Sequence, residues 1–176
     1  MAGIDTTRKF LPIRIAVLTV SDTRTEADNG SGAILVELLK RDGHTLAGKA
    51  IVRDDVSAIQ AQVQMWAADA GVDVVITTGG TGVTGRDVTP EALEALFDKH
   101  IGGFGELFRM LSYETIGVST IQSRATGGVV GTTLVFALPG STGACRDGWE
   151  KILKHQLDSR YRPCNLVEMM PRLGNV

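Results

Sequence analysis

The chain has 176 residues, with 18 Lys and Arg, 20 Asp and Glu, and a formal net charge of −2. This length suits one domain with a sizeable core. Hydrophobic residues make up 43% and charged residues 22%, a composition typical of a globular protein. The charge balance excludes a nucleic-acid binder that relies on general positive charge, but it allows a local basic pocket.

Several features indicate a protein of the reducing cytoplasm. No apolar run reaches the length of about 18 residues that a membrane span needs, and the N-terminus lacks the apolar stretch of a signal peptide. The two cysteines, Cys145 and Cys164, have neither CxxC nor zinc-site spacing, so we expect ordinary thiols. The histidines also lack ligand spacing, and we expect all three at the surface: His44, His100 and His155.

Apolar runs alternate with helical patterns along most of the chain. Residues 13–20 are almost continuously apolar and rich in β-branched side chains, which is typical of a strand covered on both faces. A helix with an apolar stripe follows and ends at Gly43, and a weaker strand is predicted over 45–52. The segment from Ser57 to Gln60 has the pattern of a capping box at the start of the next helix.

The second half of the chain continues this alternation. Residues 72–78 form another apolar run, and Thr89, which a proline follows, predicts a helix start with Thr89 as the N-cap. We expect strands within 118–138 and a last helix that ends near Leu157. Strands that alternate with helices of this length predict βαβ units and a mostly parallel sheet.

Three parts are expected: an N-terminal arm over 1–12, a domain over 13–157 and an irregular C-terminal tail over 158–176. Exposed apolar patches usually mark an interface, so the large apolar residues of both ends predict an oligomer. The alternative is that the ends fold back over their own domain. The residues in question are Phe10, Leu11, Pro12, Leu166, Val167, Met169, Met170 and Leu173.

Three polar or glycine-rich loops follow predicted strands: residues 21–22, 78–87 and 139–143. Ligands of parallel α/β sheets bind beyond the carboxyl ends of the strands, so these loops form the expected site. The glycines of the middle loop let backbone N–H groups approach a phosphate. Arg86 could clamp an anion through two N–H groups, and Asp87 could bind magnesium. A tight turn alone rarely needs four glycines with an Arg-Asp pair.

Two familiar phosphate motifs fit this middle loop poorly. The segment from Gly80 to Gly85 spells GxGxxG, but the dinucleotide-binding motif opens a helix at once, whereas here the helix start is delayed to Thr89. The Walker A motif needs Gly-Lys-Ser or Gly-Lys-Thr, which the sequence does not contain. A generic nucleotide-binding oxidoreductase is therefore disfavoured.

Two other segments each have a structural and a functional interpretation. Asp54 and Asp55 follow the second strand and suit a solvated turn or helix start; beside Asp87, one of them could also complete a magnesium site with phosphate oxygens. Ser141 or Thr142 is either a helix N-cap or part of an anion site at a helix N-terminus.

Together these segments resemble the MoaB/Mog family of molybdenum cofactor biosynthesis proteins. The most specific signature is TTGGTG followed by RDxTPE, and the resemblance extends over about residues 13–165. The matching segments are 20–22, Asp54, 77–82, 86–91 and 103–106 with Arg109, and those that look like the MoaB branch are 105–110, 122–125, 139–146 and 162–165.

The resemblance implies a three-layer α/β/α fold with a mixed, mostly parallel central sheet, in a trimer or a hexamer of two trimers. It also implies an enzyme, a molybdopterin adenylyltransferase that transfers AMP from Mg-ATP to the terminal phosphate of molybdopterin. Asp54, rather than Asp55, and Asp87 match the two catalytic acids and would hold Mg²⁺. The residues expected to bind phosphate, pterin or nucleotide are Ser21, Asp22, Thr78, Gly79, Gly80, Thr81, Gly82, Arg86, Glu106, Pro139, Gly140, Ser141 and Thr142.

A second class of function stays open, namely a non-catalytic molybdopterin-binding or scaffold protein of the same pathway. Its partners would include other proteins of the pathway, and we expect neither nucleic acid nor a membrane as a partner. Two departures from the family bear on this choice. Arg53 stands where active members typically have proline, and residues 139–144 differ from the Mog branch. Glu106 also has a structural interpretation, because an acid near a helix start complements the helix dipole.

Overall fold

A six-stranded sheet runs through the centre of the molecule in a computed structural model that describes residues 2–174. The strand order is β3-β2-β4-β7-β6-β5. The first four strands in this order are parallel, whereas β6 is antiparallel to both of its neighbours. This confirms the mixed, mostly parallel sheet. The strands are β1 Gly3–Ile4, β2 Arg14–Val20, β3 Thr45–Val52, β4 Val74–Thr78, β5 Lys99–His100, β6 Thr126–Val130, β7 Thr133–Leu138 and β8 Tyr161–Arg162.

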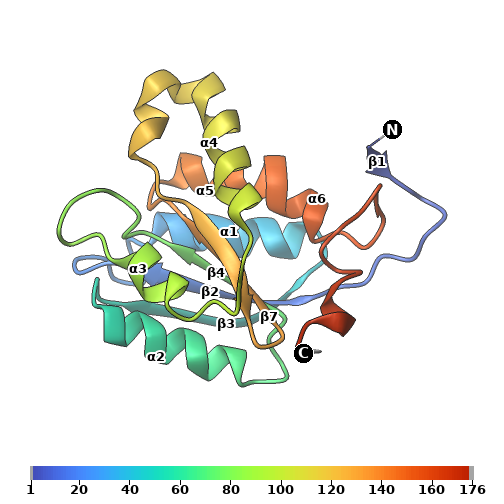
Figure 1. The fold of residues 1–176 in the computed structure, drawn as a ribbon, viewed down its shortest axis with the longest axis horizontal. Helices are drawn as coiled ribbons and strands as arrows, with labels where there is room; N and C mark the ends of the chain where they lie inside the picture. Colours follow the sequence, from blue (N-terminus) through green and yellow to red (C-terminus); the bar gives the residue numbers. More distant parts are fainter. Residues whose placement is uncertain (1, 175–176) are drawn as a thin grey trace.

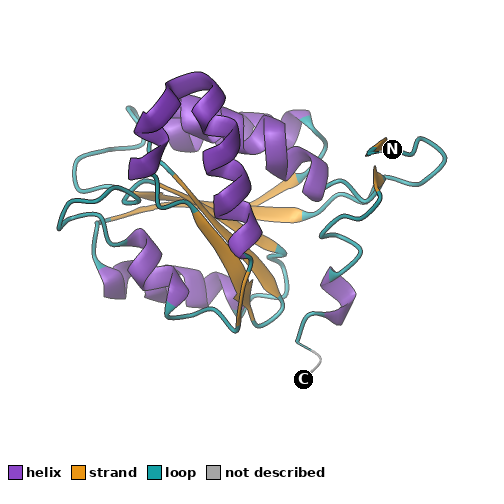
Figure 2. Cartoon of the chain, turned by 45° about the horizontal axis from the view of Figure 1, so that its top comes forward, coloured by secondary structure: helices purple, strands orange, loops and turns teal. Residues whose placement is uncertain are grey.

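Helices cover both faces of the sheet, as Figures 1 and 2 show. The helices α1, α4 and α5 lie on one face, and α2 and α3 lie on the other. These are the three layers of the expected α/β/α architecture. The helices are α1 Gly30–Arg41, α2 Val56–Ala67, α3 Thr89–Glu94, α4 Gly102–Ile116, the 3₁₀ helix η1 Gly117–Gln122, α5 Thr142–Gly148, the π-helix η2 Trp149–Leu153, α6 Lys154–Gln156 and the 3₁₀ helix η3 Met170–Arg172.

The central strands are mostly apolar because alternate side chains enter two different cores. In β2, Ile15 and Val17 pack into the core under α1, α4 and α5, whereas Ala16 and Leu18 pack into the core under α2 and α3. A strand covered on both faces cannot show an alternating polar pattern. The continuous apolar run of residues 13–20 therefore indicated the central position of β2 correctly.

The N-terminus of α2 differs from the predicted capping box. Asp55 is the N-cap, and its side chain accepts a hydrogen bond from Ala58 N at 2.8 Å. The helix begins at Val56, so the capping box predicted to start at Ser57 is wrong. An aspartate is as good an N-cap as a serine, and here it precedes the serine by two positions.

The N-terminus of α3 was also predicted wrongly. The N-cap position falls to Val88, without a side-chain cap, and Thr89 is already helical. The Thr89 hydroxyl instead donates a hydrogen bond to Gly79 O at 2.8 Å, which links the start of α3 to the glycine-rich loop after β4. A tertiary hydrogen bond to a buried carbonyl has therefore replaced the local cap.

The stretch 118–138 is only partly β-structure. Its first residues belong to η1, which extends α4 away from the sheet, and the strands start later, at β6. The strand prediction for these first residues is wrong because β-branched side chains such as Val118 and Ile121 suit a strand only where a sheet covers them. Here both are exposed, at 77% and 83%.

One of the three histidines does not lie at the surface. His44 is buried, with its ring 5.2 Å from that of Phe10 and 5.9 Å from that of Trp149. The surface prediction is wrong here because the arm before β2 folds over the end of α1 and covers the ring. His100 is exposed, as expected, and His155 is half-buried.

The two ends of the chain fold back over their own domain. The short strands β1 and β8 pair with each other, and Val167 is buried in the core under α1 and α4. Leu166, Met170 and Leu173 pack against the same core. The expectation that these residues stay exposed in a monomer is therefore wrong, although Leu11 is exposed and so is Met169. Among residues 2–174, no helix is both long and apolar enough for a membrane span.

Candidate functional site

The carboxyl ends of β2, β3, β4 and β7 meet at one edge of the sheet, as parallel strands require. A cavity of about 710 Å³ opens beside the loops that follow β4 and β7, and α4 with η1 forms its other wall. The lining residues are Arg24, Gly79, Gly80, Thr81, Gly82, Asp87, Phe108, Ser112, Thr115, Ile116, Ser119, Gln122, Ser123, Pro139, Gly140, Ser141, Gly143, Ala144 and Asp147.

The glycine loop, residues 79–87, depends on two glycines with positive φ. Gly79 has φ 103° and Gly80 has φ 64°. A Cβ on Gly79 would lie 2.2 Å from Val20 O, and one on Gly80 would lie 2.7 Å from Asp54 Oδ1. The contact at Gly79 is with backbone and excludes any side chain, and the positive φ of Gly80 disfavours any residue other than glycine there. The backbone therefore passes directly over the ends of β2 and β3.

Asp87 lies on the cavity wall with a fixed carboxylate. Its Oδ2 accepts hydrogen bonds from Thr84 N at 2.9 Å and from Thr84 Oγ1 at 2.6 Å. The bond from the Thr84 hydroxyl contributes most to holding the pKa of Asp87 below its ordinary value. Asp87 is therefore ionised at neutral pH and oriented by its own loop.

Asp54 follows β3 and shows the opposite electrostatic behaviour. Burial raises its pKa above the ordinary value, and the neighbouring carboxylates of Asp22 and Asp87 raise it further. Its backbone N–H donates to Asp22 Oδ1 at 3.2 Å. Three loops thus bring Asp22, Asp54 and Asp87 together, and Arg86 compensates the repulsion between their carboxylates only in part. Asp54 approaches the glycine loop from below and does not line the cavity.

Arg86 does not point into the cavity as an anion clamp. Its guanidinium donates to Asp22 Oδ2, which links the glycine loop to the loop after β2. The Arg86 side chain is 74% exposed. In this arrangement Arg86 neutralises an acid of the site.

Arg24 supplies the positive charge on the cavity wall instead. Its Nη2 donates to Gly140 O at 2.9 Å, and its Nη1 donates to the Ser31 hydroxyl. The side chain therefore ties together the loops after β2 and β7 and the start of α1. Sequence reasoning missed it, although its position three residues after the strand-end Ser21 was a usable signal.

The loop after β7 packs directly on the glycine loop. Ser141 is the N-cap of α5 and accepts a hydrogen bond from Ala144 N at 3.1 Å, which is the capping role that the sequence allowed. A Cβ on Gly140 would lie 3.2 Å from the Cα of Gly79, so the two loops touch through glycines. Beneath them, Thr78 Oγ1 donates to Pro139 O at 3.1 Å.

The wall formed by α4 and η1 was not predicted. Its hydroxyl side chains include Ser112, Thr115 and Ser119. Ser112 and Thr115 lie three residues apart on one face of α4, and Ser119 follows on η1, beyond the end of α4. A stripe of small hydroxyl residues at this spacing was the signal available in the sequence, and the strand prediction for the residues after 117 obscured it.

Eight of the predicted binding and catalytic residues line the cavity: Gly79, Gly80, Thr81, Gly82, Asp87, Pro139, Gly140 and Ser141. Seven others are not among the lining residues: Ser21, Asp22, Asp54, Thr78, Arg86, Glu106 and Thr142. Ser21 shapes its own turn by accepting hydrogen bonds from two backbone N–H groups, and Glu106 is exposed on α4. Within residues 2–174, no group of three or more His, Cys, Asp or Glu side chains is arranged to hold a metal ion.

A doubly covered α/β sheet with a glycine loop and a cavity beyond its strand ends is typical of proteins that bind phosphorylated ligands. Residues 16–159 match the family described as "Probable molybdopterin binding domain". Molybdenum cofactor biosynthesis protein B of Escherichia coli (strain K12) is 55% identical over 157 residues, which span 89% of this chain and 92% of that protein.

Solved structures agree with this match. A crystal structure of Molybdenum cofactor biosynthesis protein B has a TM-score of 0.86 and 44% identity, covering 96% of this chain and 100% of that one. The tungsten cofactor synthesizing protein MoaB from Pyrococcus furiosus has a TM-score of 0.75 and 35% identity, covering 93% and 98%. The chain therefore belongs to the MoaB/Mog family of molybdenum cofactor biosynthesis proteins.

Proposed function

We propose that the chain binds molybdopterin in the cavity beside the glycine loop and transfers AMP from Mg-ATP to its terminal phosphate. One observation carries the proposal: Asp87, with its carboxylate held in place, lies on the wall of a cavity that two glycine-containing strand-end loops also line. The volume of about 710 Å³ suits such a ligand, because small-molecule sites measure about 300–1,000 Å³. Family membership supports the pathway.

The reaction joins two anions, so the protein must hold phosphates together against their repulsion. The terminal phosphate oxygen of molybdopterin would form a bond to the α-phosphorus of ATP as the bond to the pyrophosphate leaving group breaks. Backbone N–H groups of the glycine loop would bind phosphate oxygens. Arg24 would add charge-assisted hydrogen bonds, because each of its terminal nitrogens has a second N–H beyond those already used.

No protein nucleophile is needed for this transfer. Cys145 lies beneath the loops, but burial raises the pKa of its thiol to about 11, so it is protonated at neutral pH. The contribution of the protein is then positioning and electrostatics, as in other phosphoryl-type transfers.

The acids at the strand ends fit a magnesium ion that arrives with the nucleotide. Mg²⁺ prefers oxygen ligands and is usually held by one or two carboxylates together with substrate phosphates. Asp54 and Asp87 would be those carboxylates. Burial raises the pKa of Asp54 most, and the carboxylates of Asp22 and Asp87 raise it further; a cation would offset this second contribution. When bound, the ion would neutralise part of the negative charge on the phosphates.

The test is a pyrophosphate-release assay with purified chain, molybdopterin and Mg-ATP. We expect release that depends on both substrates and stops when the metal is chelated. Reactions without molybdopterin serve as the control for simple ATP hydrolysis. Absence of pyrophosphate from a chain that binds molybdopterin would contradict the transferase activity.

A second candidate is a molybdopterin-binding or scaffold protein without catalysis. The position of Asp54 outside the cavity lining and the pairing of Arg86 with Asp22 favour it, because neither group faces the cavity. In that case titration would show molybdopterin binding, whereas Mg-ATP would neither bind nor be consumed.

Self-association in a trimer or a hexamer is part of the proposal, as is a cytoplasmic location. The exposed apolar side chains on the projecting α4 and η1 support an interface there: Met110, Tyr113, Ile116, Val118 and Ile121. Light scattering at micromolar concentration tests it. A mass near 18.7 kDa would refute the oligomer, and a mass near three times that value would refute the hexamer alone.

A further inference from the structure

Arg124 lies in the segment between η1 and β6 and directs its guanidinium at the glycine loop. Nε donates to Gly82 O at 2.7 Å, and Nη2 donates to Asp87 O at 2.7 Å. The third nitrogen, Nη1, pairs with the Glu91 carboxylate on α3. The Arg124 backbone N–H adds a bond to Thr81 O at 3.2 Å. One residue thus contacts the loop on both sides of its tip, residues 83–86.

The segment that carries Arg124 is itself anchored to α4. Arg109 Nη1 donates to Ala125 O at 3.2 Å and to Ser123 O at 3.4 Å. A Cβ on Gly105 would lie 2.3 Å from Ala125 O, so α4 approaches this segment as closely as a glycine allows. Arg124 therefore connects the glycine loop to the wall on the other side of the cavity.

Apart from Arg124, the tip of the loop, residues 83–86, is tied to the rest of the protein by the ion pair of the exposed Arg86 side chain with Asp22. Val83, Thr84, Gly85 and Arg86 are all exposed. Within the tip, Thr84 and Asp87 bind each other, but these bonds set the shape of the tip and not its placement on the protein. Both carbonyls that flank the tip accept from the guanidinium of Arg124. A planar group with fixed N–H directions sets the distance between two acceptors more strictly than a flexible ammonium does.

We propose that Arg124 is a positioning residue of the site: it holds Gly82 and Asp87, which flank the tip of the glycine loop, at the spacing at which Asp87 faces the cavity. The role in turnover rests on the proposed function, whereas the role in holding the loop does not. Arg124 lies 37 residues from Asp87 in the sequence, and its guanidinium donates to the backbone carbonyl of Asp87.

The experiment compares Arg124→Ala, Arg124→Lys and Glu91→Gln with the wild-type chain by hydrogen–deuterium exchange and by pyrophosphate release. Arg160→Ala is the matched control, because Arg160 also binds a carboxylate through several nitrogens, far from the loop, and its side chain is 32% exposed, like that of Arg124. We expect the loop amides of Arg124→Ala to exchange at least about tenfold faster, while amides of β2 and β4 keep their rates.

For turnover we expect kcat to fall by about 10- to 100-fold in Arg124→Ala, with the KM for molybdopterin nearly unchanged, because small misplacements of catalytic groups have effects of that size. Arg124→Lys should recover part of the loss, since an ammonium reaches one carbonyl. Glu91→Gln should behave like wild type, because both carbonyl bonds remain.

Several outcomes would overturn the inference. Wild-type exchange in the loop of Arg124→Ala would do so, and so would faster exchange throughout the protein, which indicates general destabilisation. A loss in Glu91→Gln equal to that in Arg124→Ala would show that the ion pair, rather than the carbonyl bonds, matters. If the wild-type chain releases no pyrophosphate, the proposed function fails, and the exchange data alone decide the role of Arg124.

Discussion

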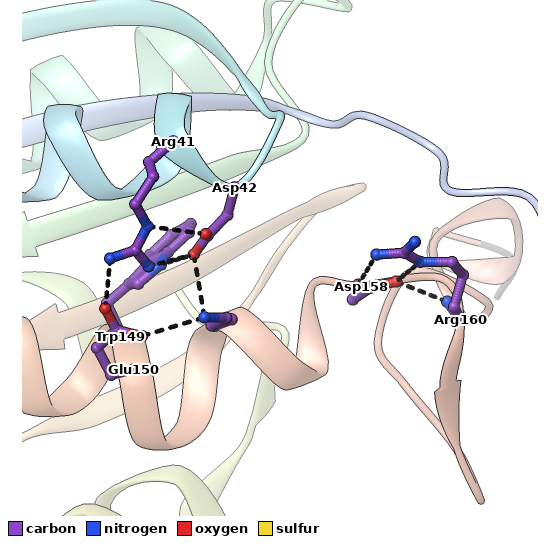
Figure 3. Close-up of polar contacts among 7 residues, drawn as sticks. Arg41, Asp42, Trp149, Glu150, Asp158 and Arg160 are labelled. Carbon is purple, nitrogen blue, oxygen red and sulfur yellow. Dashed lines mark hydrogen bonds and ion pairs between the residues drawn. The ribbon is translucent and has the colours of Figure 1, made fainter. Parts of the chain in front are cut away.

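Two aspartates at the opposite ends of β3 differ in how their charge is compensated. Asp42 precedes the strand and accepts hydrogen bonds from Arg41 Nε at 2.9 Å, Arg41 Nη2 at 2.8 Å and Trp149 Nε1 at 2.8 Å, with Lys154 at 3.9 Å (Figure 3). Although burial opposes it, these partners keep the pKa of Asp42 below its ordinary value. Asp54 follows the strand, and its pKa is raised by burial, Asp22 and Asp87.

The difference separates a structural polar cluster from a candidate site. Around Asp42 every charge has partners within the chain, and Glu150 completes the network through Arg41 and Lys154 (Figure 3). Around Asp54 two neighbours are further acids, Asp22 and Asp87, and Arg86 offsets their charge only in part. Carboxylates with unfavourable neighbours are common at functional sites, which supports the proposed role of Asp54. The predictions below test this contrast from the largest expected effect to the smallest.

Asp87→Asn should abolish adenylyl transfer and leave the fold intact. An asparagine oxygen can still accept the two Thr84 bonds, but the negative charge that would hold Mg²⁺ is lost. We expect a decrease in kcat of about 10²–10³-fold, the size typical of losing one electrostatic group of a transition state. Circular dichroism provides the folding control. Pyrophosphate release at the wild-type rate by a folded variant would contradict the role of Asp87.

Asp54→Asn should lose activity and gain stability. The pKa of Asp54 is higher in the folded chain than its ordinary value of 3.8. The contribution of Asp54 to the free energy of unfolding therefore decreases as the pH rises from 3.8 through the folded-state pKa, and it stays low at higher pH. Removal of the charge should therefore make the variant more stable than wild type at pH 7, while transfer falls at least about tenfold.

Asp55→Asn is the control for Asp54→Asn. Asp55 caps α2, and asparagine caps equally well, so both activity and stability should stay close to wild type. Urea unfolding at pH 4 and pH 7 together with the pyrophosphate assay distinguishes the two positions. Equal losses at both aspartates would contradict the assignment of the catalytic acid to position 54.

Asp42→Ala should lose stability and keep activity, the reverse of Asp54→Asn. The variant leaves the indole N–H of the fully buried Trp149 without its acceptor. An unsatisfied buried donor costs about 1–3 kcal/mol, which urea unfolding would detect. Arg41→Ala removes exposed ion pairs of the same cluster and should cost at most about 1 kcal/mol. A larger loss from Arg41→Ala than from Asp42→Ala would contradict this ranking.

His44→Asn should change the pH dependence of stability slightly. Burial lowers the pKa of His44, while the nearby Asp42 and Asp158 oppose the shift. The neutral His44 ring contributes fully to the free energy of unfolding above its ordinary pKa of 6.5. This contribution is lost as the pH falls through the lower pKa of the folded state. Asparagine can accept from Ile13 N in its place, so the variant should lose less stability than wild type between pH 6.5 and pH 5. Thermal unfolding across this range measures it.

Local patterns were sufficient for much of the fold and for part of the site. The apolar runs that correspond to β2, β4 and β7 predicted a sheet covered on both faces. Side chains of a strand point alternately to the two faces, so a strand buried on both faces needs apolar residues at consecutive positions. Glycine clusters directly after strands marked the loops at the sheet edge, since a strand end fixes where the next residues lie. For the same reason Asp87 could be assigned to the site from its place in the glycine loop.

Long-range contacts decided the rest. Which cation faces the cavity depends on partners far away in the chain: Arg86 pairs with Asp22, while Arg24 reaches Gly140. The hydroxyl wall of α4 and η1 and the contacts of Arg124 with the glycine loop likewise join segments that are distant in the sequence. Residue types and spacing determine what a segment can form, because propensity and periodicity act over a few residues. Only tertiary packing determines which of the possible partners a side chain meets, because the partners lie in segments that are far apart in the sequence.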